Sequence, residues 1–309
     1  MDLGFYMPNS NTGANRSGIL DIGRDAEQMG FASLWVADHI VAPTKVVSKY
    51  PFHPEGAYHN VPETPYLEPL TTLAFAAAAT EQVKLVVSVL ILPYRHPLAT
   101  AKIAATIDVL SNGRLVLGVG VGWMEEEFEA LGHTYFKRRG LNTKEQLEIM
   151  LRAWTGEAFS FSGEFYEFDE VVVSPVPVQK NLPVWVGGHS DAALKRAVAF
   201  GQAVNSNAET PDDIATVIDR LQDFSAAAGR SEPPAVTLRS HLRIADEVVP
   251  FRPGHIIGPV DYVIETLSAY AELGVTDFGI DNRVDGIDVM RANLDAMGPV
   301  LDSFGRRSI

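Results

Sequence analysis

Two stretches near opposite ends of the chain decide the fold: MGFASLWV at Met29–Val36 and LGVTDFGI at Leu273–Ile280. Each contains an apolar helix end, a glycine that caps it, a short loop and an apolar strand. Between them, short apolar strands alternate with longer amphipathic helices, a pattern typical of βα units around a parallel sheet. The pattern predicts eight strands, at Leu3–Met7, Leu34–Ala37, Lys84–Leu92, Leu115–Val119, Val184–Val186, Ala203–Asn205, Val236–Ile244 and Val275–Ile280.

Helices are predicted promptly after all but one of these strands, and so many βα units favour a closed (β/α)8 TIM barrel over an open doubly wound sheet. No linker interrupts residues 1–309, so we expect a single domain with insertions at about 41–68 and 124–182. The second insertion contains a hairpin-like pattern at Phe159–Val173. The predicted helices are Gly18–Gly30, Tyr66–Thr80, Pro97–Leu110, Lys144–Trp154, Ser190–Phe200, one that begins at Thr210, Pro259–Leu273 and Ile287–Leu301.

The composition excludes several classes of function. The chain has no cysteine, so disulfides, thiolate–metal sites and a cysteine nucleophile are absent. Its net charge of −14 opposes nucleic-acid binding, which depends on phosphate neutralisation by Lys and Arg. No signal-like segment opens the chain, and no apolar run approaches the roughly 20 residues of a membrane span. We therefore expect a soluble cytoplasmic protein with no membrane or nucleic-acid partner.

The active site of a barrel of this kind lies at the carboxyl ends of the strands, so the residues there are the candidates. Asp38-His39 follows the second strand, and a neutral imidazole at His39 could contact a cofactor or exchange a proton near pH 7. Ser88 is a lone small polar residue in the apolar third strand. It is either a satisfied core hydroxyl or a point where a planar ligand approaches the backbone, and the sequence leaves both readings open.

Glycines mark two further candidate segments. In GVGVG, Gly118–Gly122, every second residue lacks a side chain, which suits a flat ring or a phosphate lying against Gly120, Val121 and Gly122. Gly187-Gly188-His189-Ser190 opens a helix, where amide groups and the helix dipole favour an anion such as phosphate.

Other sites are disfavoured. The glycines lack the GxGxxG spacing of a dinucleotide fold, and no Gly-x-Ser-x-Gly motif supports a hydrolase. His53 and His59 lie in the large loop with acidic neighbours, but no tight ligand spacing indicates a metal, so we expect none. Glu125-Glu126-Glu127 is interpreted as a solvated helix start that complements the helix dipole.

Together these motifs resemble the bacterial luciferase-like monooxygenase family, in the branch of coenzyme F420-dependent oxidoreductases. The similarity spans nearly the whole chain and is carried by Ser33–His39 (SLWVADH), Pro69–Thr80 (PLTTLAFAAAAT), Ser88–Pro97 (SVLILPYRHP), Leu110–Leu131 (LSNGRLVLGVGVGWMEEEFEAL), Phe161–Phe168, Pro183–Ser190 (PVWVGGHS) and Gly258–Gly274.

The resemblance implies a barrel with insertions, usually dimeric, that holds a cofactor ring at its mouth. Family members often carry a non-prolyl cis peptide in the third strand, and the matching bond here is Ser88-Val89. His39 matches a histidine near the ring in deazaflavin enzymes, and Gly187-Gly188 matches the phosphate loop. The chain departs from some deazaflavin dehydrogenases at Trp123, where those carry a glutamate proton donor. This departure makes sugar-phosphate dehydrogenation less favoured.

The leading hypothesis is hydride transfer between coenzyme F420 and a small organic substrate in a homodimer, with His39 as the catalytic residue. The predicted cofactor contacts are Asp38, His39, Ser88, Val89, Gly120, Val121, Gly122, Gly187, Gly188, His189 and Ser190. One alternative is an FMN-dependent monooxygenase that uses O2, and another is a barrel without cofactor that acts as a binding protein. Lys137–Arg139 and Lys195-Arg196 are candidates for a basic groove that receives the acidic F420 tail, and the aromatic loop Val41–Pro69 predicts a mostly apolar substrate pocket.

Overall fold

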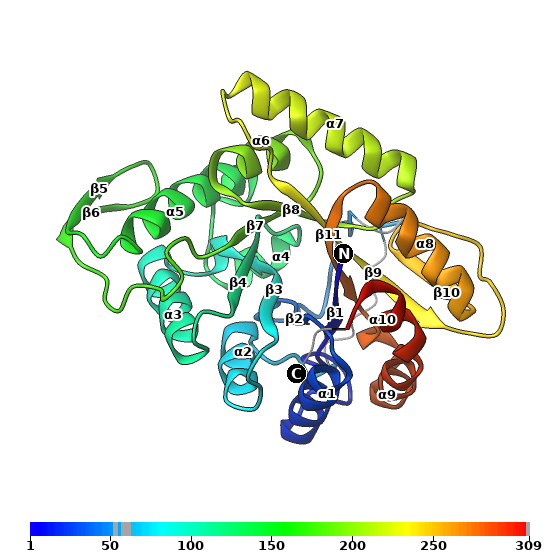
Figure 1. Cartoon of the computed structure of the whole chain (residues 1–309). Helices are drawn as coiled ribbons and strands as arrows, with labels where there is room; N and C mark the ends of the chain where they lie inside the picture. Colours follow the sequence, from blue (N-terminus) through cyan, green and yellow to red (C-terminus); the bar gives the residue numbers. More distant parts are fainter. Residues whose placement is uncertain (52–54, 57–62, 307–309) are drawn as a thin grey trace.

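Eight parallel strands close into a barrel in the computed structural model, which describes residues 1–51, 55–56 and 63–306 (Figure 1). The ring closes because β1 pairs with both β2 and β11, and β9 pairs with both β11 and β8. The predicted (β/α)8 fold is therefore confirmed. The barrel strands are β1 Asp2–Tyr6, β2 Ser33–Val36, β3 Lys84–Ile91, β4 Leu115–Gly120, β7 Val184–Gly187, β8 Ala203–Asn207, β9 Ala235–Ile244 and β11 Val275–Ile280.

Helices surround this barrel, and local capping signals set their ends (Figure 1). Asn15 caps the first helix by accepting a hydrogen bond from the Gly18 amide, and Gly30 ends it with a φ of 93°. The helices are α1 Arg16–Met29, α2 Pro69–Ala77, α3 Pro97–Leu110, α4 Glu125–Ala130, α5 Arg139–Ala153, α6 Asp191–Phe200, α7 Pro211–Ala227, α8 Val260–Glu272, α9 Ile287–Ala296 and α10 Gly298–Phe304, with short 3-10 turns η1 Leu92–Tyr94, η2 Phe136–Arg138 and η3 Arg283–Asp285.

Several predicted boundaries were wrong. The helix predicted from Tyr66 begins only at Pro69, because Glu68 caps it and accepts from the Thr71 amide. The single predicted C-terminal helix is two helices that meet at Met297–Pro299. The helix start at Glu125–Glu127 opens the short helix α4, whereas the strand β10 His255–Gly258, which pairs with β9, was not predicted.

Large side chains fill the inside of the barrel below its mouth. Tyr6, Trp35, Val86, Val116 and Trp185 come from five strands and form one buried cluster, in which the rings of Trp35 and Trp185 lie 5.5 Å apart. The barrel is thus a packed core rather than a pore, and ligands must bind at the strand ends.

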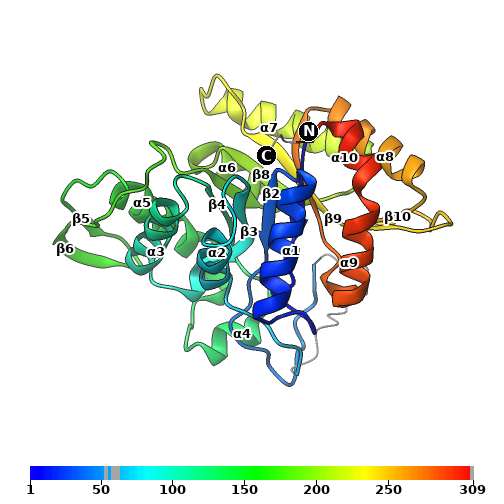
Figure 2. The ribbon, with the colours of Figure 1, turned by 60° about the horizontal axis from the view of Figure 1, so that its bottom comes forward.

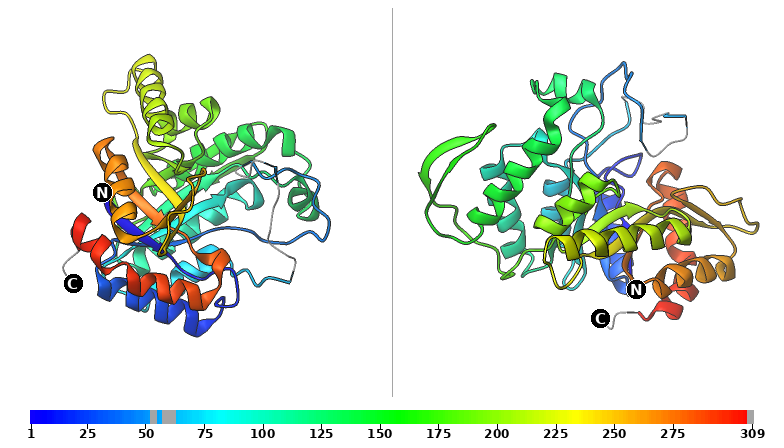
Figure 3. Two further views of the ribbon diagram at one scale, coloured as in Figure 1. Left: turned by 90° about the vertical axis from the view of Figure 1, so that its right-hand side faces the viewer. Right: turned by 90° about the horizontal axis from the view of Figure 1, so that it is seen from above.

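The mouth lies at the end of the molecule opposite to both chain termini. Figure 2 shows α4 and the loop after β2 gathered at this end, while the N and C labels stand at the other. The hairpin of β5 Phe159–Ser162 and β6 Glu167–Val171, which confirms the predicted one, and the β9–β10 extension project from opposite flanks (Figure 3). Of the predicted loop residues, Phe52, His53, Tyr58 and His59 lie outside the described residues. None of the helices in the described part of the chain has the length and apolar character needed to cross a bilayer.

Candidate active site

His39 stands at the mouth, held by a buried carboxylate. Its Nδ1 lies 2.7 Å from Oε2 of Glu127, whose side chain is fully buried. The same oxygen accepts from the Tyr94 hydroxyl at 2.9 Å, and Oε1 accepts from the amides of Ile40 at 2.7 Å and Val41 at 3.2 Å. An ionised carboxylate only accepts hydrogen bonds, so Nδ1 carries the proton that it donates to Glu127. This contact fixes the tautomer of His39, with its basic lone pair on Nε2.

The electrostatics of Glu127 agree with an ionised state. Burial alone would raise the pKa of its carboxyl, but the hydrogen bond and charge of His39 and the amides of Ile40 and Val41 together lower it. The interpretation of Glu125-Glu126-Glu127 as a solvated helix start is therefore wrong for Glu127. It lies beside Phe128 on the buried side of α4, and three consecutive glutamates concealed that spacing in the sequence.

Glu126 performs a similar task for the roof loop, the segment after β2 that contains Val47 and Ser48. Its Oε1 accepts from the amides of Val47 at 2.6 Å and Ser48 at 2.9 Å, and the Ser48 hydroxyl accepts from the Glu125 amide at 3.0 Å. The hydrogen bonds from these amide groups outweigh the effect of burial and lower the pKa of Glu126 to about 2. Helix α4 thereby ties down both the loop after β2 and the imidazole of His39.

An aromatic wall flanks His39. The imidazole meets the ring of Tyr66 edge-on at 5.5 Å and the ring of Trp123 at 6.5 Å, and Tyr50 packs against Trp123 at 5.1 Å. Trp123 occupies the position of the family acid and contributes an apolar face rather than a proton. The nearby carboxylate is instead supplied four residues later by Glu127, on the Nδ1 side of the histidine.

Asp38, next to His39 in the chain, is buried, and other residues of the protein bind both of its carboxylate oxygens. Its two oxygens accept from both terminal nitrogens of Arg95, at 2.6 and 2.9 Å, and from the Ile91 amide at 2.9 Å. Arg95 also binds Glu68 at 2.9 Å. Burial raises the pKa of Asp38 despite this partner. The geometry gives Asp38 a clear role in joining the ends of β2 and β3, while its contact with a cofactor remains a prediction.

The third strand bulges into the barrel at Ser88-Val89. This peptide bond is cis, as the family resemblance implied, and the pairing of β3 with β4 shifts register between Val87 and Leu90. The Ser88 hydroxyl donates to Asn205 Oδ1 at 2.6 Å, and its carbonyl accepts from the Tyr6 hydroxyl at 3.2 Å. The hydroxyl is thus satisfied in the core, whereas the neighbouring Val89 is half-buried.

The alternate glycines of β4 make room for this bulge. A Cβ on Gly120 would lie 2.5 Å from Cγ2 of Val89, and one on Gly118 would lie 2.2 Å from the Val87 carbonyl oxygen. At Gly122 the neighbour at 2.8 Å is the ring of Phe128. The expectation that the missing side chains leave an open slot is therefore wrong at these points, because neighbouring residues occupy the space. Contact between a ring and the backbone of Gly120, Val121 or Gly122 stays a prediction.

The predicted anion site forms the turn between β7 and α6. Gly188 adopts a φ of 95° and its amide donates to the Asn205 carbonyl at 2.9 Å. Ser190 caps α6 by accepting from the Ala193 amide at 3.3 Å, and His189 Nδ1 lies 2.8 Å from the Ser206 hydroxyl. The first-turn amides of a helix have no intrahelical acceptor, so this end suits an oxyanion.

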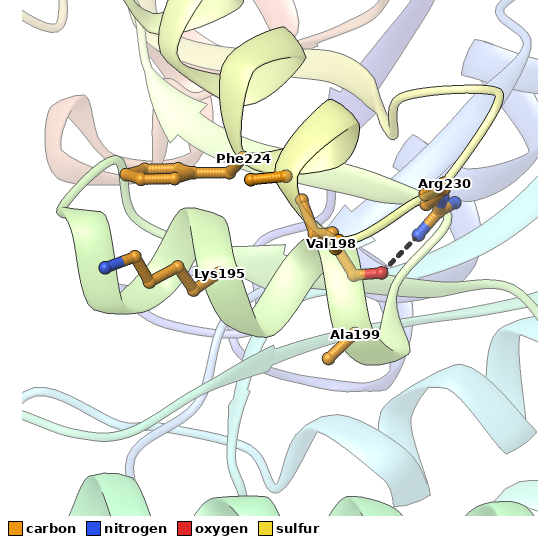
Figure 4. A pocket seen from close by; sticks show the side chains of 7 residues that line it. Lys195, Val198, Ala199, Phe224 and Arg230 are labelled. Atoms are coloured by element: carbon orange, nitrogen blue, oxygen red, sulfur yellow. Dashed lines mark hydrogen bonds between the residues drawn. The ribbon is translucent and has the colours of Figure 1, made fainter.

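The basic residues predicted to receive the F420 tail lie in two separate places, so they do not form one groove. Arg139 reaches the mouth, where its Nε donates to the Gly122 carbonyl at 2.9 Å. Lys195 lies instead on the outer wall, 4.8 Å over the ring of Phe224, in a shallow groove between α6 and α7 (Figure 4). Arg230 closes one end of this groove by donating to the Val198 carbonyl at 2.8 Å. The groove is thus separate from the strand ends.

Sequence reasoning missed a group of charged residues at the mouth, next to Tyr66. Arg283 binds both oxygens of Asp281, at 2.9 and 2.7 Å, and lies 4.6 Å over the ring of Tyr6. Burial would lower the pKa of Arg239, but Tyr6, Tyr50 and Asp281 raise it. The signal for Arg239 was present, since an arginine between the buried residues Leu238 and Ser240 of a strand needs a polar environment at the strand end. Within the described ranges, no cluster of histidines and carboxylates suited to a metal occurs.

Comparison with known proteins gives a consistent family. The model of the luciferase-like monooxygenase family matches residues 1–249. An uncharacterized protein of Mycobacterium tuberculosis is 34% identical over 268 residues, which cover 84% of this chain and 86% of that protein. An FMNH2-dependent dimethylsulfone monooxygenase of Pseudomonas putida is 32% identical over 157 residues, or 50% of this chain and 43% of that enzyme.

The fold comparison extends over the full barrel. The solved structure of an F420-dependent secondary alcohol dehydrogenase, in complex with an F420–acetone adduct, superimposes with a TM-score of 0.80 at 17% identity and covers 98% of both chains. This likeness shows the shared fold, and the match to the family model shows the lineage. The chain belongs to the luciferase-like monooxygenase family.

Proposed function

We propose that this protein is an oxidoreductase that transfers a hydride between coenzyme F420 and an organic substrate. The observation that carries the proposal is the imidazole of His39, placed at the mouth with its Nδ1 on the buried Glu127 carboxylate. A histidine in this state can accept or return one proton at Nε2 each time a hydride moves. Membership of the family and the F420-dependent dehydrogenase of the same fold support the choice.

The residues at the mouth fit such a cofactor. The Ser88-Val89 bulge and the backbone of Gly120, Val121 and Gly122 would lie against the ring. Gly187 and Gly188 would shape the turn, and the amides of His189, Ser190 and the first turn of α6 would hold the phosphate. When bound, the reduced deazaflavin supplies the hydride. The chain orients the ring, excludes water with the roof loop that Glu126 tethers, and holds a proton on His39.

We propose that Asp38 acts by positioning rather than by touching the cofactor, because Arg95 and the Ile91 amide already occupy its oxygens. Tyr50, Tyr66 and Trp123 would line an apolar substrate pocket beside His39. We also propose that the protein acts in the cytoplasm as a homodimer, which the family resemblance implies and which analytical ultracentrifugation would test.

An FMN-dependent monooxygenase is the second candidate, favoured by the aligned dimethylsulfone monooxygenase. Absorbance titrations of the purified protein with F420 and with FMN separate the two. We expect F420 to bind more tightly than FMN. During turnover we expect the absorbance of reduced F420 to disappear without uptake of O2. Tighter FMN binding with O2 consumption would establish the monooxygenase instead, and failure to bind either cofactor would support a barrel that serves only as a binding protein.

A further inference from the structure

One face of β9 carries a row of basic side chains from the barrel interior out over the mouth. Residues two apart on a strand share a face, so Arg239, His241 and Arg243 lie on the same side as Thr237. Thr237 is inside the barrel, where its hydroxyl accepts from Asn205 at 2.9 Å. The intervening Leu238, Ser240 and Leu242 are buried on the opposite face, whereas Arg239, His241 and Arg243 are half-buried. The row therefore leads from the barrel interior to the rim beside β10, in the extension visible in Figure 3.

Two polar atoms in this row lack a partner. His241 binds Asp285 through Nε2 at 2.5 Å, but its Nδ1 is buried without a hydrogen bond, and so is Nε of Arg243. These are two of the five such side-chain atoms found in the described part of the chain. A buried polar atom without a partner costs about 1–3 kcal/mol, so two of them two residues apart indicate a place that a ligand completes.

The charge balance indicates the sign of that ligand. Asp281 interacts electrostatically with Arg239 and Arg283, and both of its oxygens accept hydrogen bonds from Arg283. Asp285 is the carboxylate that acts on His241 and Arg243. Among the described residues, three guanidinium groups thus face two carboxylates at this rim, in a protein whose net charge is −14. Such a local excess of positive charge favours an anion.

The sheet order separates this row from the proposed cofactor contacts. Those contacts belong to β3, β4 and β7, which are consecutive in the barrel, whereas β9 lies between β8 and β11. His39, at the end of β2, lies at the other end of the β3–β4–β7 group. A substrate that meets the ring beside His39 would thus extend toward β9.

We propose that the row Arg239–His241–Arg243 binds a carboxylate of the substrate, so that the protein acts on organic acids with an apolar body. The inference rests on the proposed function. The apolar part of the substrate packs against Tyr50, Tyr66 and Trp123, and the carboxylate meets the guanidinium of Arg239. Arg243 then donates from its free Nε to the carboxylate, and the free Nδ1 of His241 accepts from a water bound to it.

The test uses the protein loaded with F420 and four probes: benzoate, phenylacetate and their neutral amides, benzamide and phenylacetamide. Isothermal titration calorimetry is expected to show each acid binding about tenfold or more tightly than its amide, since hydrogen bonds to charged groups contribute about 1.5–3 kcal/mol. Arg239→Met is expected to abolish this preference. Arg24→Met removes the same charge from the exposed side of α1 and is expected to preserve it.

Each outcome decides the inference. If the acids bind no better than the amides, or do not bind at all, the assignment is wrong. The same holds if Arg239→Met keeps the preference. If Arg239→Met weakens F420 but not its tail-free chromophore, the carboxylate belongs to the cofactor tail, and the substrate assignment fails. Absorbance titration with F420 on the same variants separates these results from failure of the proposed function, in which the wild-type protein would not bind F420.

Discussion

Replacing Glu127 with glutamine tests the link between α4 and the chemistry of His39. The glutamine carbonyl can still accept from the amides of Ile40 and Val41, but its NH2 group then faces His39 Nδ1 and the Tyr94 hydroxyl. Two hydrogen bonds to a charged acceptor are lost, each contributing about 1.5–3 kcal/mol. The imidazole must also reverse its tautomer, because Nδ1 becomes an acceptor and Nε2 takes the proton.

We expect Glu127→Gln to reduce turnover by about 10²–10⁴, the usual contribution of general acid–base catalysis, with F420 affinity little changed. Stopped-flow absorbance measures the rate, and nitrogen NMR of labelled histidine reports the protonated ring nitrogen. Glu125→Gln, one residue away and outside this network, is the matched control. Turnover within error of wild type, or an Nδ1-protonated His39 in the variant, would refute the reasoning.

Two further perturbations test the packing of the mouth. Gly120→Ala is expected to destabilise the fold by about 1–3 kcal/mol through overpacking against Val89, and Val89→Ala in the same chain should recover much of this loss in urea unfolding; additive losses would contradict the contact. Glu126→Gln is expected to speed tryptic cleavage of the roof loop at pH 8, because the Val47 and Ser48 amides lose a charged acceptor. Because the pKa of Glu126 is lowered, this tether contributes its full stability above pH 4.5 and loses it as the pH falls through about 2. An unchanged cleavage rate in the variant would show that Glu126 does not hold the loop.

The sequence predicted the barrel well because the βα alternation is local. Strand and helix signals such as Gly30 and Pro97 act within a few residues, and the ring of eight follows from their repetition. The mouth was also located correctly, since His39 and Gly187 follow strands. In a parallel barrel every strand end reaches the same face, so these positions could be assigned without knowing any long-range contact.

The partners at the mouth were not predictable in the same way. Glu127 lies 88 residues from His39 in the chain, and a run of three glutamates is most often solvent-exposed. The role of Gly120 depended on Val89, which stands in another strand and reaches it only through the bulge. The row on β9 was not recognised, because Arg239, His241 and Arg243 alternate with Leu and Ser in the way typical of any strand with one solvent-facing side.

The two adjacent glutamates of α4 give the protein a mechanical property that neither residue would have alone. A single six-residue helix holds the roof through Glu126 and the imidazole through Glu127. Lifting residues 47–48 away therefore pulls on the same backbone that orients His39. The placement of the loop at Val47–Ser48 and the orientation of the His39 ring are thus coupled through one short stretch of backbone.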